Sequence, residues 1–265
     1  MKNVRTYGTA PFQVAIIHGG PGAPGEMAPV ARELSLLCGV LEPLQTKTTA
    51  AEQVEELATV LKEHGDLPII LIGHSWGAML SYIFTARHPS FVKKLILVSS
   101  GPFEAHYASS IMETRLSRLT REERARFDKL SRALDDPTNS DRNTTFAQLG
   151  ELTSKTDAYD ALPHENNVIE VDAALFESVW QDATQMRSSG ELLKLGRKIH
   201  CPVVAIHGDY DPHPAEGIAA PLSRVVSDFR FILLERCGHH PWYEQYAKEP
   251  FYTILKRELA AIVAE

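Results

Sequence analysis

The sequence predicts an α/β fold in which helices cover both faces of a mostly parallel sheet. Short apolar runs alternate with helical patterns through the first hundred residues, and the same alternation returns after about residue 198. Runs that are apolar at every position indicate strands buried on both faces, as in parallel sheets between helices. Residues 103–197 contain helical patterns and no strong strand run. We therefore expect an α/β core formed by 1–102 and 198–265, with a mainly helical insertion at 103–197.

The first half of the core contains four strand patterns, at 14–17, 40–41, 68–72 and 95–98. Helical patterns lie between them at 29–37, after Thr49, and at 76–87. Thr49 with Glu52 three residues later predicts a capping box. The spacing of Val54, Leu57 and Leu61 then gives that helix one apolar stripe.

The remainder of the chain contains two further strand patterns, at 202–206 and 231–234, and a final helix at 249–263. Ile254, Leu255, Leu259 and Ile262 share one face of that helix. In the insertion, helices are expected at 112–134 and 173–195. Residues 135–145 contain Pro, Asn and Ser, which favour turns, so we expect a loop there.

Composition excludes several classes of protein. The chain has 265 residues with 27 Lys and Arg against 34 Asp and Glu, a formal net charge of −7, which argues against nucleic-acid binding. No apolar run approaches membrane-spanning length, and no signal-peptide pattern follows Met1. Three scattered cysteines without a Cys-x-x-Cys pair fit a reduced compartment. We expect a cytoplasmic protein without nucleic-acid or membrane partners; the oligomeric state does not follow from the sequence.

The pattern Gly73-His74-Ser75-Trp76-Gly77 lies directly between a strand and a helix. Gly-x-Ser-x-Gly in this context is typical of a nucleophile elbow, a tight turn that exposes a strained Ser between small neighbours. Ser75 is therefore the expected nucleophile. An ordinary strand–helix turn is the alternative interpretation of the same pattern.

A nucleophilic Ser needs a histidine base and an acid that orients it. Asp209 and Asp211 both follow the strand at 202–206, and we favour Asp211 because it lies further past the strand end. His239 and His240 follow the strand at 231–234. Only one of them can face Ser75, and Gly238 favours His239. His240 is then expected at the surface or in a pocket wall.

The loop after the first core strand, His18-Gly19-Gly20-Pro21-Gly22, predicts an oxyanion hole. Backbone N–H groups in such a hole stabilise the negative charge of the tetrahedral intermediate. We assign these donors to the amides of Gly20 and Trp76. The loop lacks the Lys-Ser/Thr of a phosphate-binding loop and the third Gly of a dinucleotide-binding motif.

Together these residues resemble the α/β-hydrolase superfamily over essentially the whole chain. The Gly19–Gly20 loop with the Ser75 elbow looks like the proline iminopeptidase branch of serine hydrolases. The resemblance implies the α/β-hydrolase fold and no cofactor. It also places Asp211 and His239 at the acid and histidine positions of the family's motifs, and makes 103–197 a cap, or lid, inserted after the sixth strand.

Two features depart from that resemblance. Only residues 2–7 could form a strand ahead of the one at 14–17, where the family has a longer antiparallel start, so the sheet is expected to be smaller. An aminopeptidase also needs an acid to bind the substrate ammonium. Glu104 and Glu177 are the substrate-binding candidates, with Glu170 and Asp182 as further acids of the insertion. The predicted function is hydrolysis of a small-molecule ester, amide or peptide substrate, with a proline iminopeptidase as the alternative.

Two interpretations from other classes compete with this one. The first is a metal site, because four possible ligands occupy every second position: His207, Asp209, Asp211 and His213. On a strand their side chains would face the same way. However, Gly208 and two prolines interrupt strand geometry there. A non-catalytic binding protein with the same fold is the second alternative. It predicts a damaged triad, whereas Ser75, Asp211 and His239 are all present.

Overall fold

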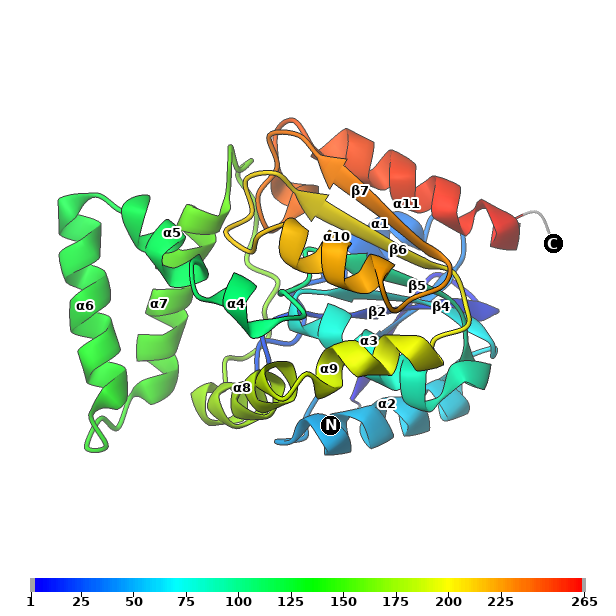
Figure 1. Ribbon diagram of the computed structural model, residues 1–265, viewed down its shortest axis with the longest axis horizontal. Coiled ribbons are helices and arrows are strands. Elements are labelled where there is room, and N and C mark those ends of the chain that lie inside the picture. The colour runs from blue at the N-terminus through cyan, green and yellow to red at the C-terminus, as the bar shows by residue number, and fades with distance from the viewer. Residues whose placement is uncertain (1–2, 264–265) are drawn as a thin grey trace.

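The computed structural model describes residues 3–263 and contains one seven-stranded sheet (Figure 1). The strand order is β1-β3-β2-β4-β5-β6-β7. Every neighbouring pair is parallel except β1 with β3, which is antiparallel. The predicted fold class, a mostly parallel sheet between helices, is confirmed.

All six strand patterns of the sequence correspond to strands, and a short strand precedes them. The strands are β1 (Val4–Tyr7), β2 (Phe12–Ile17), β3 (Gly39–Pro43), β4 (Ile69–His74), β5 (Val92–Val98), β6 (Val203–Gly208) and β7 (Phe229–Leu234). The expected strand over 2–7 is thus seen from Val4, and Lys2 lies outside the described residues. β1 pairs only with β3, at the edge of the sheet.

The core lies on both faces of the sheet, because successive side chains of a strand point to opposite faces. In β2, Ala15 and Ile17 belong to one buried cluster, whereas Val14 and Ile16 belong to the other. All four side chains are fully buried. This arrangement explains why the sequence shows an unbroken apolar run there instead of alternation.

Two helices cover one face of the sheet, α1 (Ala28–Leu34) and α11 (Lys248–Val263), while α2 (Ala50–His64), α3 (Trp76–Arg87) and α10 (Glu216–Ser223) cover the other. The Thr49 side chain accepts a hydrogen bond from the Glu52 amide, so the predicted N-cap of α2 is confirmed. Short 3-10 turns η1 (Pro89–Phe91) and η3 (Pro241–Tyr243) precede β5 and α11.

A helical segment connects β5 to β6. It consists of α4 (Ala105–Ala108), α5 (Ile111–Ser117), α6 (Arg121–Asp135), α7 (Arg142–Asp157), α8 (Ala173–Ser188), α9 (Glu191–Lys194) and η2 (Leu195–Lys198). The helices α5, α6 and α7 extend away from the sheet, on the left of Figure 1. Because a single strand precedes β2, this helical segment follows the fifth strand of the chain. The expectation that it is inserted after the sixth strand was wrong.

The helices of this segment are shorter and more numerous than expected. The helix predicted over 112–134 is interrupted where Thr120 forms a capping box with Glu123 and starts α6. The one predicted over 173–195 is interrupted at Gly190, which has a φ of 75°. The loop expected over 135–145 ends at Asp141, where α7 begins; this helix has little apolar periodicity to reveal it. Among residues 3–263, no helix has both the length and the apolar character that crossing a membrane requires.

Candidate active site

Ser75 lies at the sharp turn between β4 and α3. Its backbone has a φ of 52° and a ψ of −115°, a conformation that is costly for any residue except glycine. Two small neighbours make the turn possible, because a Cβ on Gly73 would lie 2.2 Å from the carbonyl oxygen of Gly77, and a Cβ on Gly77 would lie 2.3 Å from that of Ile17. The Ser75 amide donates to the carbonyl of Val98 at 3.0 Å. The strained turn therefore holds Ser75 at the carboxyl end of the sheet, where sites of parallel α/β sheets lie.

Asp211, in the loop after β6, is shared between two histidines. Its Oδ2 accepts a hydrogen bond from Nδ1 of His239 at 2.7 Å. Its Oδ1 accepts from Nδ1 of His213 at 2.7 Å and from the His213 amide at 2.9 Å. The two imidazole rings stack with centroids 4.7 Å apart. The hydrogen bond from His213 to Asp211 depends on how the loop turns. The sequence separation of two residues between them could therefore not predict it.

Asp209, the alternative acid, has a different partner. Its side chain is exposed, and Oδ1 accepts a hydrogen bond from the amide of Cys237 at 3.1 Å. That bond joins the loops that follow β6 and β7. The contacts therefore favour Asp211 as the residue that orients His239.

Burial and charge set the protonation of this pair. Burial alone would raise the pKa of Asp211, but the charges of His239 and His213 and the hydrogen bond from His213 outweigh burial and hold it well below its ordinary value. Burial lowers the pKa of His239 by more than Asp211 raises it. Near pH 7 the acid is ionised and the imidazole is neutral, which are the states that a general base and its orienting acid need.

The loop after β2 packs directly against the elbow. A Cβ on Gly19 would lie 2.9 Å from Cβ of Ser75, so only glycine fits there. Gly20 has a φ of 38°, in the left-handed region. Trp76 is the first residue of α3, so its amide has no acceptor within the helix. Both predicted oxyanion donors, Gly20 and Trp76, thus belong to segments that contact or adjoin Ser75.

A second carboxylate lies behind this site. Oε2 of Glu26 accepts from the Gly19 amide at 2.9 Å and contacts Nδ1 of His74 at 3.0 Å. Oε1 of Glu26 lies 2.8 Å from Nε2 of His240. His240 is therefore a partly buried partner of Glu26, because the loop turns its ring inward against His74 and leaves 19% of its side chain exposed. It does not lie on the open surface, and a position in a pocket wall stays a prediction.

The acids of the insertion proposed to bind substrate are engaged in ion pairs. Glu104 accepts from Arg224 at 2.7 Å, and Glu177 pairs with Arg142. Among the described residues, no contact of either carboxylate with Ser75 or His239 is found. A role of Glu104 or Glu177 in binding an ammonium group stays a prediction.

Within residues 3–263, two groups of side chains have ligand atoms close enough to hold a metal ion: Glu26 with His74 and His240, and Asp211 with His213 and His239. In both, the histidine nitrogens already face the carboxylate oxygens at hydrogen-bond distance. The alternating ligand set suggested by the sequence does not form, because Asp209 points to Cys237 instead.

The insertion is bound to the loop that carries His239. The His239 amide donates to the carbonyl of Asp157 at 2.8 Å, and the carboxylate of Asp157 is held by two hydrogen bonds from Arg115, at 2.8 and 2.6 Å. Glu244 accepts from the Gly238 amide and from two amides of the insertion. The position of His239 thus depends on both parts of the chain.

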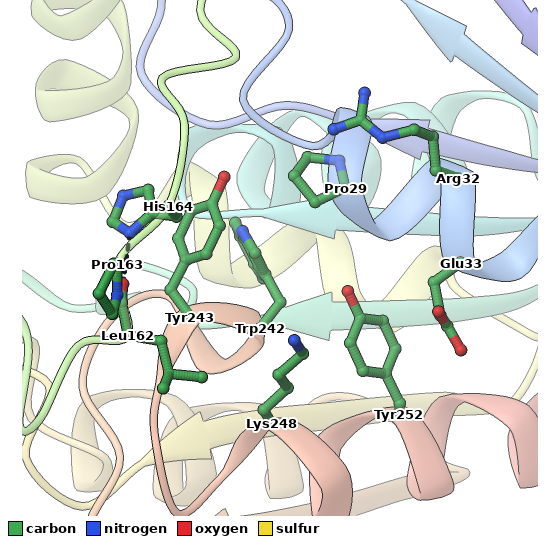
Figure 2. A pocket seen from close by; sticks show the side chains of 10 residues that line it. All are labelled: Pro29, Arg32, Glu33, Leu162, Pro163, His164, Trp242, Tyr243, Lys248 and Tyr252. Carbon is green, nitrogen blue, oxygen red and sulfur yellow. Dashed lines mark hydrogen bonds between the residues drawn. The ribbon is translucent and has the colours of Figure 1, made fainter.

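A surface cavity of about 480 Å³ lies near this loop but outside the site (Figure 2). It is enclosed by α1, the start of α11 and residues 162–164, and Trp242 and Tyr243 form its inner wall. His164 stacks on Tyr243 with ring centroids 3.7 Å apart. Neither Ser75 nor His239 lines this cavity, so it is not where the proposed nucleophile would meet a substrate.

Comparison with known proteins agrees with the fold. The chain is 25% identical over 254 residues to the pimeloyl-[acyl-carrier protein] methyl ester esterase of Chromobacterium violaceum, covering 90% of this chain and 91% of that protein. Among solved structures it resembles VinJ, with a TM-score of 0.67, 18% identity and coverage of 97% and 94% of the two chains. It also resembles the proline iminopeptidase of Mycobacterium smegmatis, with a TM-score of 0.62, 19% identity and coverage of 98% and 95%. Residues 21–245 match the alpha/beta hydrolase fold family. The chain therefore belongs to the alpha/beta hydrolase fold family and is a hydrolase.

Proposed function

We propose that the protein is a serine hydrolase that cleaves a carboxylic ester or amide through an acyl-enzyme, with Ser75, His239 and Asp211 as its triad. The observation that carries this proposal is the 2.7 Å hydrogen bond from His239 to Asp211, together with the strained turn that holds Ser75 at the same edge of the sheet. Residues 1–102 and 198–265 form the catalytic core in this proposal, and 103–197 the cap over it.

In the first half of the reaction, Nε2 of His239 accepts the Ser75 proton while Oγ attacks the substrate carbonyl carbon. The amides of Gly20 and Trp76 donate hydrogen bonds to the oxyanion. The bond to the leaving group then breaks, and His239 gives the proton to the departing alcohol or amine. Water attacks the acyl carbon in the second half and loses a proton to His239. That proton returns to Oγ as the carboxylic acid leaves.

An ester is the better substrate class for this site. The relative from C. violaceum is named as a methyl ester esterase. Amide cleavage by an aminopeptidase would need a free acid to hold the substrate ammonium, and Glu104 and Glu177 are both paired with arginines. If Glu104 or Glu177 is the anchor, the proline iminopeptidase alternative therefore requires that its ion pair opens.

Covalent labelling with a fluorophosphonate tests the proposal. We expect one adduct per chain in the wild type and none in Ser75→Ala, with kcat for a p-nitrophenyl short-chain ester reduced by several orders of magnitude. Ser223→Ala, on the exposed face of α10, is the control and should label as the wild type does. Equal labelling of Ser75→Ala would refute the proposal, and wild-type protein that neither labels nor turns over esters would favour the non-catalytic alternative.

A further inference from the structure

Glu26 connects the neighbours of the two central residues of the proposed triad. It contacts His74, which precedes Ser75, and His240, which follows His239. His74 is the last residue of β4, His240 lies in the segment after β7, and Glu26 lies in the segment between β2 and α1. One carboxylate thus joins three segments that must keep a fixed spacing for the proposed chemistry to occur.

The network continues from Glu26 to the backbone of the general base. Nε2 of His74 lies 2.9 Å from the carbonyl oxygen of His239, and the two imidazole centroids are 4.8 Å apart. A carbonyl oxygen only accepts, so Nε2 of His74 is the donor. Nδ1 then faces Glu26 Oε2 at 3.0 Å, and one proton must lie between those two atoms for the contact to be a hydrogen bond. Contacts of 3.0 Å and 2.9 Å therefore link Glu26 through the two ring nitrogens of His74 to the carbonyl oxygen of His239.

Glu26 also fixes the oxyanion loop. It accepts the Gly19 amide hydrogen at 2.9 Å, and this bond sets the orientation of the backbone just before Gly20. A Cβ on Gly19 would lie only 2.9 Å from Cβ of Ser75, so this backbone packs directly against the serine. The His74 side chain is fully buried and that of Glu26 is 19% exposed, so water competes little for these bonds.

We propose that Glu26 is a positioning residue of the hydrolase site, which fixes Ser75, His239 and the oxyanion loop relative to one another through His74, His240 and the Gly19 amide. The inference rests on the proposed function. Glu26 touches no reacting atom. Its contribution is to hold the geometry that the transition state requires, so its loss is expected to lower kcat and to leave KM nearly unchanged.

Glu26→Ala and Glu26→Gln test this role at pH 8 with a p-nitrophenyl ester. We expect Glu26→Ala to lose about 10²-fold in kcat, the size of effect that a displacement near 1 Å produces. The Gln side chain can accept from the Gly19 amide and donate to a neutral His240, so Glu26→Gln should recover activity to within about tenfold of wild type. Glu258→Ala is the matched control, because Glu258 is a buried carboxylate paired with Lys94 and Arg230 on the far part of α11; it should lower Tm without changing kcat.

Two further measurements separate positioning from a general loss of structure. Titration of active sites with the phosphonate corrects kcat for any misfolded fraction. The inhibition constant of a small boronic acid, which forms a tetrahedral adduct with the serine, should rise in parallel with the loss of kcat/KM. A loss explained by the titrated fraction alone, a change confined to KM, or Glu26→Gln as impaired as Glu26→Ala would overturn the inference. Failure of the proposed function itself would appear separately, as labelling of Ser75→Ala.

Discussion

Replacing Asp211 by Asn should nearly abolish turnover while preserving the shape of the loop. The side chain has two different surroundings: Oδ1 accepts two hydrogen bonds from His213, and Oδ2 accepts one from His239. In the Asn variant the amide oxygen is expected to take the side with two donors, one of them the rigid backbone amide. The NH2 group then faces Nδ1 of His239.

That placement reverses the direction of the essential hydrogen bond. The Asn NH2 group donates to Nδ1 of His239, which moves the imidazole proton to Nε2, the atom that must accept the proton of Ser75. Loss of the correct tautomer costs on the order of 10⁴ in kcat, or about 5 kcal/mol in the activation barrier. The assay is kcat and kcat/KM on a p-nitrophenyl short-chain ester.

Asp209→Asn is the matched control, two residues away in the same loop. The Asn oxygen can still accept from the Cys237 amide, as Asp209 does at 3.1 Å, so kcat should change by less than about threefold. An Asp211→Asn variant that is as active as Asp209→Asn, or more active, would refute the assignment of the acid and the tautomer argument with it.

Three further predictions follow from the site. Burial lowers the pKa of His239 more than Asp211 raises it. A plot of kcat/KM against pH should therefore fall on the acid side as one proton binds, with a midpoint below about 6.5, the ordinary pKa of histidine. A midpoint above that value would contradict the protonation argument. Gly77→Ala should lower the free energy of unfolding, measured by urea denaturation, by about 1–3 kcal/mol or more, because the new Cβ would lie 2.3 Å from a carbonyl oxygen of β2. Unchanged stability would show that the elbow can relax. Proline arylamide turnover should be weak beside ester turnover, and efficient turnover that Glu104→Gln or Glu177→Gln selectively removes would favour the iminopeptidase alternative.

Local patterns in the sequence determined the fold class and the positions of the main site segments. The apolar runs predicted β2, β4, β5 and β6 because a strand buried on both faces has no polar alternation to obscure it. The run at 231–234 also predicted β7, although that edge strand is mostly half-buried or exposed. The Ser75 elbow was predictable for a similar reason: the glycines on either side are required by contacts under 2.5 Å, and the pattern records that requirement directly. Helix α7 escaped prediction because most of its side chains are only partly buried or exposed and its apolar positions form no clear stripe.

Tertiary structure alone decided how the site is held together. His240 and Glu26 are 214 residues apart in the chain, and His74 and His239 are 165 apart, so no local spacing could relate them. The loop that carries His239 and His240 likewise decides which of the two pairs with Asp211, because it turns one ring toward Asp211 and the other toward Glu26. The sequence determined which chemical groups reach the carboxyl edge of the sheet, because strand ends are locally encoded. Which of those groups pair was decided by packing, because hydrogen bonds between distant loops form only when the sheet brings them together.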